Sequence, residues 1–150
     1  MKSTQFLLMN IIFFCMFITA CSTEVPTYES KQAIVNGDVV SVHGQITNID
    51  KLEDFIDKVN NGEKDKVTVT TYTIEGDAII HVLNYNGKNI QYDVDMRRDN
   101  YAAKEDRKIE KYKFTNIGKE TNEGITYYYL YNNDKAIRIS VLEASTLPNN

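Results

Sequence analysis

A β-hairpin pattern in residues 79–96 constrains the fold more than any other feature of the sequence. Apolar and polar residues alternate over 88–96, which is the period of a strand with one buried face. Asn86-Gly87 separates this run from the apolar segment 79–85, and that dipeptide favours a two-residue type I′ turn. The sequence therefore predicts two antiparallel strands joined by a tight turn.

The turn also predicts the register of the hairpin. A two-residue turn at Asn86-Gly87 pairs Tyr85 with Lys88 and sets His81 opposite Tyr92. We expect the apolar face of this hairpin to pack on a helix. That face carries Ile79, His81, Leu83, Ile90, Tyr92 and Val94.

The sequence predicts that helix at residues 49 to about 61. Its apolar residues recur at i, i+3, i+6, i+7 and i+10, which places them in one stripe. Asn48 or Asp50 can cap its start, and Gly62 follows its last turn as a helix-terminating glycine does. The stripe consists of Ile49, Leu52, Phe55, Ile56 and Val59.

The remaining patterns predict an α+β domain over residues 30–143, followed by a flexible C-terminus at 144–150. One main amphipathic helix packs on a mostly antiparallel sheet of five or six strands. A short helix at 30–35 ends at Asn36-Gly37. Six strands are expected at 67–74, 79–85, 88–96, 108–117, 125–131 and 136–142, with a polar loop at 97–106. Residues 39–42 form a short strand or a buried extended segment.

The first 21 residues have the layout of a signal peptide, with a lysine, a short apolar run at 6–18 and small residues before Cys21. As a helix the apolar run spans about 20 Å, short of the roughly 30 Å hydrocarbon core of a bilayer. Ile18-Thr19-Ala20-Cys21 resembles a bacterial lipobox, whose cysteine thiol accepts diacylglycerol. We expect cleavage after residue 20, a lipid on Cys21, a tether over 21–29 and a location on the outer face of the cell membrane. An ordinary secretory signal with a chance cysteine is the alternative.

Net charge and cysteine content limit the kinds of partner and chemistry that the chain can have. The net charge is −4, and since Lys2 is the only charged residue among 1–20, the mature side chains sum to −5. Such a chain is repelled by nucleic acid, which we do not expect as a partner. Cys15 and Cys21 are the only cysteines, so the mature domain has no disulfide and no cysteine nucleophile. Hydrophobic residues at 42% and charged residues at 25% are typical of a folded domain.

The histidines and clustered aspartates are weak candidates for chemistry. His43 and His81 are the only histidines, and without a thiol they need carboxylates from the fold to bind zinc. We interpret His43 as a turn residue and His81 as a ring stacked on Tyr92. Asp93, Asp95 and Asp99 resemble part of a calcium loop, but arginines occupy its fifth and sixth positions. No cofactor or metal is predicted.

A run of tyrosines is the most unusual feature of the mature chain. On a strand, Tyr127, Tyr129 and Tyr131 share one face with Ile125, while Tyr128 lies on the other. Such rings bind protein surfaces or stack on sugars, and they also serve cross-strand packing. The candidate binding residues are Tyr127, Tyr129, Tyr131, His43 and His81.

Several short motifs resemble one family. They are Asn36-Gly37-Asp38-Val39-Val40, His43-Gly44, Lys66-Val67, Tyr72-Thr73-Ile74-Glu75-Gly76-Asp77 and Tyr85-Asn86-Gly87-Lys88. Over roughly 34–100 the chain resembles the small lipoproteins of low-GC Gram-positive bacteria grouped as domain of unknown function 4362. The resemblance implies export, lipidation and the fold, and it implies no catalytic residue because the family has no established activity.

The sequence contains no Gly-x-Ser-x-Gly elbow, no Ser-x-x-Lys and no phosphate-binding glycine loop. We therefore expect a non-enzymatic, lipid-anchored envelope module that binds a protein or peptide. A binder of small ligands or cell-wall glycan is the alternative, and a hydrolase with His43 or His81 as its base is the third. The oligomeric state and the identity of the partner do not follow from the sequence.

Overall fold

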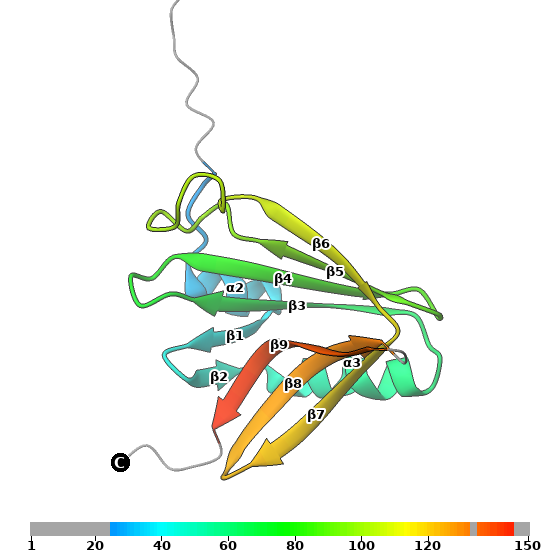
Figure 1. Ribbon diagram of the computed structural model, residues 1–150. Coiled ribbons are helices and arrows are strands. Elements are labelled where there is room, and N and C mark those ends of the chain that lie inside the picture. The colour runs from blue at the N-terminus through cyan, green and yellow to red at the C-terminus, as the bar shows by residue number, and fades with distance from the viewer. Residues whose placement is uncertain (1–24, 133–134, 146–150) are drawn as a thin grey trace, which may run out of the picture.

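The structure, a computed structural model, describes residues 25–132 and 135–145. These residues form two helices, a six-stranded, mostly antiparallel sheet (the large sheet) and a three-stranded sheet (the small sheet), as Figure 1 shows. The α+β class is confirmed, whereas the single sheet that we expected is replaced by two. The elements are α2 (Ser30–Asn36), β1 (Val39–Val42), β2 (Gln45–Thr47), α3 (Ile49–Asn60), β3 (Asp65–Tyr72), β4 (Ala78–Tyr85), β5 (Ile90–Asp95), β6 (Ile109–Phe114), β7 (Asn116–Asn122), β8 (Ile125–Asn132) and β9 (Lys135–Ser145).

The predicted signal peptide, Cys21, residues 22–24 of the tether and residues 146–150 of the C-terminus lie outside the described residues. Within the described part, neither helix is long and apolar enough to cross a membrane.

The large sheet has the strand order β2-β1-β3-β4-β5-β6, and the small sheet has the order β7-β8-β9. Every pair of neighbouring strands is antiparallel except β1 and β3. Parallel strands need a crossover connection, and here the chain makes it through β2 and α3. The crossover carries α3 onto one face of the large sheet.

One hydrophobic core lies between α3, the large sheet and the small sheet. Leu52 and Phe55 of α3 are fully buried in it, and each such side chain stabilises the fold by about 1.5–3 kcal/mol. The small sheet contributes Ile117, Tyr128, Leu130 and Leu142. Side chains alternate along β1, so Val39 faces this core while the next residue points to the other face, where α2 lies behind β3 and β4 (Figure 1).

The predicted register of the β4–β5 hairpin is wrong by two residues. Tyr85 pairs with Ile90, and the loop is centred on Gly87 and Lys88 instead of Asn86 and Gly87. Gly87 has a φ of 92° and Lys88 has no positive φ, which matches a type II′ turn with glycine in first position. The Asn86 side chain instead accepts hydrogen bonds from the backbone N–H groups of the two residues before β5. A shift of two leaves every side chain on its predicted face.

The segment predicted as one strand over 108–117 is two strands in different sheets. β6 pairs with β5 and β7 pairs with β8, and Thr115 alone joins them. Phe114 and Ile117 are both buried in the core, yet residues three apart cannot share a face of a straight strand. The chain therefore bends at Thr115 and leaves the large sheet.

The predicted side-chain cap of α3 is also absent. Asn48 precedes α3 with a left-handed φ of 60°, and its side chain makes no capping hydrogen bond. It instead donates to the backbone carbonyl oxygen of Asp38 at 2.8 Å. The asparagine thus ties the start of α3 to the end of α2 and the start of β1.

Candidate functional site

The tyrosine-rich strand β8 is the centre of the small sheet, with β7 and β9 on its two sides. Tyr128 and Leu130 point into the core, where they are 3% and 0% exposed. Tyr127, Tyr129 and Tyr131 lie on the opposite face and are half-buried. The structure therefore brings these three candidate residues together on one outward face, which we call the tyrosine face.

Gly118 of β7 shapes the tyrosine face. It pairs with Tyr129, and a Cβ atom at position 118 would lie only 3.3 Å from the Tyr129 ring. The ring therefore lies over the glycine backbone, and its centroid is 5.7 Å from that of Tyr131, tilted by 46°. Two adjacent rings of this kind offer a wide amphipathic contact surface that loses little conformational entropy on binding. Gly118 is not among the candidates predicted from the sequence, although a lone glycine within a strand pattern indicates close approach of another group.

A charged contact fixes the small sheet to α3. Glu53 accepts a hydrogen bond from the Tyr128 hydroxyl at 2.6 Å and pairs with the Lys119 ammonium at 2.5 Å. Burial raises the pKa of Glu53, but the hydrogen bonds from Lys119 and Tyr128 outweigh it, so that the pKa lies below its ordinary value. Burial and the carboxylate raise the pKa of Tyr128. The tyrosine face is thus held at a set orientation by the residue on its reverse side.

His81 lies on the core-facing side of β4, away from the tyrosine face. It stacks on Tyr92 as expected, with centroids 5.9 Å apart and planes 8° from parallel. The two are diagonal neighbours, because His81 pairs with Val94. Its ring nitrogens contact the hydroxyl groups of Tyr92 at 2.8 Å and Thr71 at 3.3 Å. Burial lowers the pKa of His81 to about 4, so the ring is neutral at pH 7 and far from the pKa that suits a general base there.

His43 occupies the tight turn between β1 and β2. Val42 pairs with Gln45, and His43 and Gly44 have φ values of 49° and 82°, which a type I′ turn requires. The side chain is exposed. This placement agrees with the interpretation of His43 as a turn residue.

A buried polar network surrounds Asp38. Its carboxylate accepts hydrogen bonds from the hydroxyl groups of Thr70 at 2.7 Å and Tyr28 at 2.9 Å. Tyr72 in turn donates to the backbone carbonyl oxygen of Tyr28 at 2.8 Å. Burial, together with the charge of Asp38, raises the pKa of Tyr72 to about 12, so this hydroxyl stays a donor at neutral pH. The network fastens the described end of the predicted tether to the large sheet.

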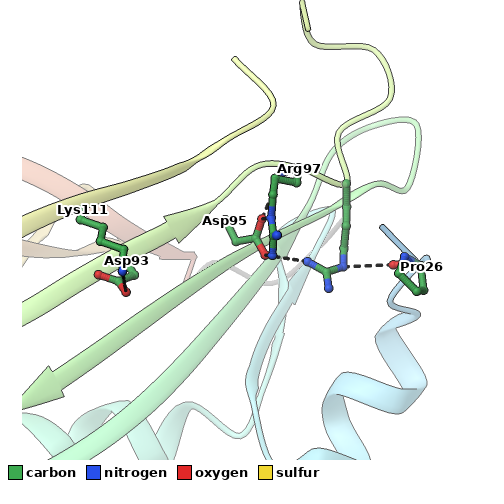
Figure 2. A network of polar contacts seen from close by, with 6 residues as sticks. Pro26, Asp93, Asp95, Arg97 and Lys111 are labelled. Carbon is green, nitrogen blue, oxygen red and sulfur yellow. Dashed lines mark hydrogen bonds and ion pairs between the residues drawn. The ribbon is translucent and has the colours of Figure 1, made fainter. Parts of the chain in front are cut away.

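Two of the three aspartates that resemble a calcium loop form ion pairs with cationic side chains. Asp95 forms ion pairs with Arg97 and Arg98, each at 2.8 Å, and Asp93 forms one with Lys111 at 3.5 Å (Figure 2). The hydrogen bond from the Arg97 side chain lowers the pKa of Asp95 to about 2. The two arginines that break the calcium motif are thus the partners of one of its carboxylates. Among the described residues, no group of three or more His, Cys, Asp or Glu side chains is placed to hold a metal ion.

Two hollows of similar size lie elsewhere on the described surface. One, of about 310 Å³, lies between α3 and β3 and is lined mainly by charged side chains, among them Lys51, Asp54, Lys58 and Asp65. The other, of about 320 Å³, lies beside the described start of the chain and includes Val25, Tyr28 and Arg98. Neither is lined by a residue of the tyrosine face.

Comparison with known families identifies the domain. Residues 36–129 match the family described as "Domain of unknown function (DUF4362)". The chain belongs to this family. The match confirms the resemblance to domain of unknown function 4362, and the DUF4362 region extends beyond the short motifs to the tyrosine strand. No curated protein and no solved structure matches the chain.

The DUF4362 region contains most of the parts described above. It includes Asp38, Thr70 and Tyr72 of the buried network, and it includes Gly118 and Tyr129 of the tyrosine face. It begins after Tyr28 and stops before Tyr131. The family match therefore covers part of each sheet, ends before β9, and assigns no activity to either sheet.

Proposed function

We propose that this protein is a lipid-anchored module of the bacterial envelope that binds another protein or a peptide through its tyrosine face and catalyses no reaction. The single observation that carries the binding role is the pair of adjacent rings, Tyr129 over Gly118 and Tyr131 beside it, on the face of β8 that the core does not use. Tyrosine is enriched where proteins bind one another because it supplies a large contact area with few rotatable bonds.

Export and anchoring rest on the sequence. The proposal takes residues 1–20 as a signal peptide, Cys21 as the acylated first residue and 21–29 as the tether. The anchor requires Cys21, so a serine at that position should leave the protein unlabelled by a clickable fatty acid and free of the membrane fraction. Equal labelling of both forms would contradict the anchor.

The binding surface is tested by cross-linking and capture from intact envelopes. Wild type is compared with a Tyr129→Ala, Tyr131→Ala double variant and with Tyr112→Ala, which removes an exposed tyrosine from the large sheet as a control. We expect one partner to be retained by wild type and Tyr112→Ala and lost from the double variant. Identical partners for all three proteins would count against the tyrosine face.

The same rings support a second candidate, a binder of cell-wall glycan, because sugars also stack on exposed aromatic faces. Both Tyr129 and Tyr131 are half-buried outside the core, which leaves ring surface for a sugar. Titration with soluble glycan fragments, followed by tyrosine fluorescence, separates the two. Saturable binding that the double variant lacks would favour glycan over protein.

A further inference from the structure

Three segments that are distant in the sequence meet at one end of the large sheet. They are residues 25–29, the β3–β4 turn at 73–77 and the β5–β6 loop at 96–108, and together we call them the anchor end. Arg98 donates to the carbonyl oxygen of Pro26 at 3.1 Å, which ties the first segment to the third (Figure 2). The side chain of Asp77 accepts two hydrogen bonds from Asn100, at 2.7 and 3.1 Å, which tie the second to the third.

The covalent chain sets how far this end can lie from Cys21. Only residues 22–24 separate Cys21 from Val25, and four residue steps span at most about 14 Å even when fully extended. Val25 lines the hollow of about 320 Å³ that the three segments enclose. A lipid on Cys21 therefore keeps Val25, the start of the anchor end, within about 14 Å of the anchored cysteine, whatever path the connecting residues take.

The anchor end exposes two large side chains with apolar surface. Ile74, in the β3–β4 turn, is 89% exposed, and Tyr101, in the β5–β6 loop, is 76% exposed. Both lie in segments joined by the Asp77–Asn100 contact. An aliphatic side chain and a tyrosine at loop tips suit the boundary between head groups and acyl chains, where a ring can bury its body and keep its hydroxyl wet.

Charge does not account for this surface. The arginines that could attract anionic head groups are engaged, since Arg97 and Arg98 bind Asp95, and the nearby Asp99 accepts backbone hydrogen bonds within its own loop. Of the three other basic residues of the β5–β6 loop, Lys108 forms an ion pair with Glu110 at 3.1 Å and Arg107 donates to backbone carbonyl oxygens of its own loop. Lys104 is followed directly by two acidic residues. Contact through Ile74 and Tyr101 is therefore apolar, and it should depend little on salt or on anionic lipid.

We propose that the anchor end rests on the bilayer that holds the lipid of Cys21, with Ile74 and Tyr101 inserted at the interface, so that the domain has one fixed orientation on the membrane. This inference rests on the lipid anchor of the proposed function. The β4–β5 turn then points away from the membrane, because the eight residues of β4 separate it from the anchor end by about 26 Å.

The chain contains no tryptophan, so a single one reports its own depth. We would place Tyr101→Trp and, as the matched control, Lys88→Trp in the full-length lipidated protein on neutral phosphatidylcholine vesicles. Inserted Tyr101→Trp should emit at a blue-shifted wavelength, and brominated acyl chains should quench most of its intensity. The Lys88→Trp variant should keep its wavelength and its intensity. Adding Ile74→Asp should restore part of the lost Tyr101→Trp intensity.

The outcomes separate the inference from the anchor on which it rests. Protein that floats with the vesicles but shows equal quenching at both positions overturns the fixed orientation and leaves the anchor standing. Protein that fails to float, or that floats equally well as Cys21→Ser, overturns the anchor and the orientation together. Quenching that disappears at high salt contradicts the apolar character of the contact.

Discussion

Removal of one hydroxyl group, in Tyr128→Phe, tests how the tyrosine face is held. The hydroxyl donates to the Glu53 carboxylate at 2.6 Å, and the tyrosine is 3% exposed. A hydrogen bond to a charged group contributes about 1.5–3 kcal/mol. The Glu53 side chain is 34% exposed and keeps Lys119 as a partner, so water can replace part of the loss. We expect the lower end of that range, about 1.5 kcal/mol.

The assay is urea unfolding followed by circular dichroism. The dependence of the unfolding free energy on urea concentration should be the same for wild type and variant, so that a shift of the midpoint reports stability. In a thermal scan the same loss should lower the midpoint by about 5 °C for a domain of this size. Tyr127→Phe is the matched control, because it makes the same chemical change one residue away on the outer face. Its effect should stay below about 0.5 kcal/mol, as at most surface positions.

Equal effects of Tyr128→Phe and Tyr127→Phe would refute the role given to Glu53. A double-mutant cycle with Glu53→Gln adds a second criterion, since residues in direct contact show coupling of about 0.5 kcal/mol or more. Additive losses would mean that the small sheet is held by apolar packing alone.

Three further predictions concern protonation and shape. His81 has a pKa of about 4, below its ordinary 6.5, so the folded state binds fewer protons between these values and stability should fall as pH drops through that window. An NMR titration should find the ring neutral at pH 6, and His81→Gln should flatten the stability profile. Asp95 has a pKa of about 2, below its ordinary 3.8. Its ion pairs therefore contribute about 1 kcal/mol to folding stability above pH 3.8, and this contribution is lost as the pH falls toward 2. Unfolding of Asp95→Asn should lack that decline. Gly118→Ala should push the Tyr129 ring off the strand, which shifted Tyr129 ring resonances and weaker partner capture would report.

Much of the fold follows from period and turn chemistry. The stripe over 49–60 and the alternation over 90–95 each predict an element, because a buried face must repeat with the period of its backbone. The hairpin register does not follow, since Asn86-Gly87-Lys88 allows a I′ turn on its first two residues and a II′ turn on its last two. Both turns bury the same face, so burial cannot choose between them.

The second sheet could not be predicted from the sequence, for a different reason. Phe114 and Ile117 are three apart, and that spacing breaks the alternation of a single strand. The break signals a bend at Thr115, but it does not say whether the chain returns to the same sheet. That choice depends on α3, since Glu53 offers a charged partner to the strands that leave. The contacts of Glu53 with Lys119 and Tyr128 join residues 66 and 75 positions apart, so no local sequence pattern predicts them.

The orientation of β8 shows the same limit at the candidate site. Alternation alone groups Tyr127, Tyr129 and Tyr131 on one face, but both faces of this strand carry tyrosines, so hydrophobicity does not decide which is inner. A buried hydroxyl decides it, because the inner tyrosine must have a hydrogen-bond partner, and the Tyr128 hydroxyl finds one in Glu53. A strand turned over would bury three tyrosine hydroxyls in place of one, each needing a partner. The acid on α3 therefore selects the face that remains available for binding.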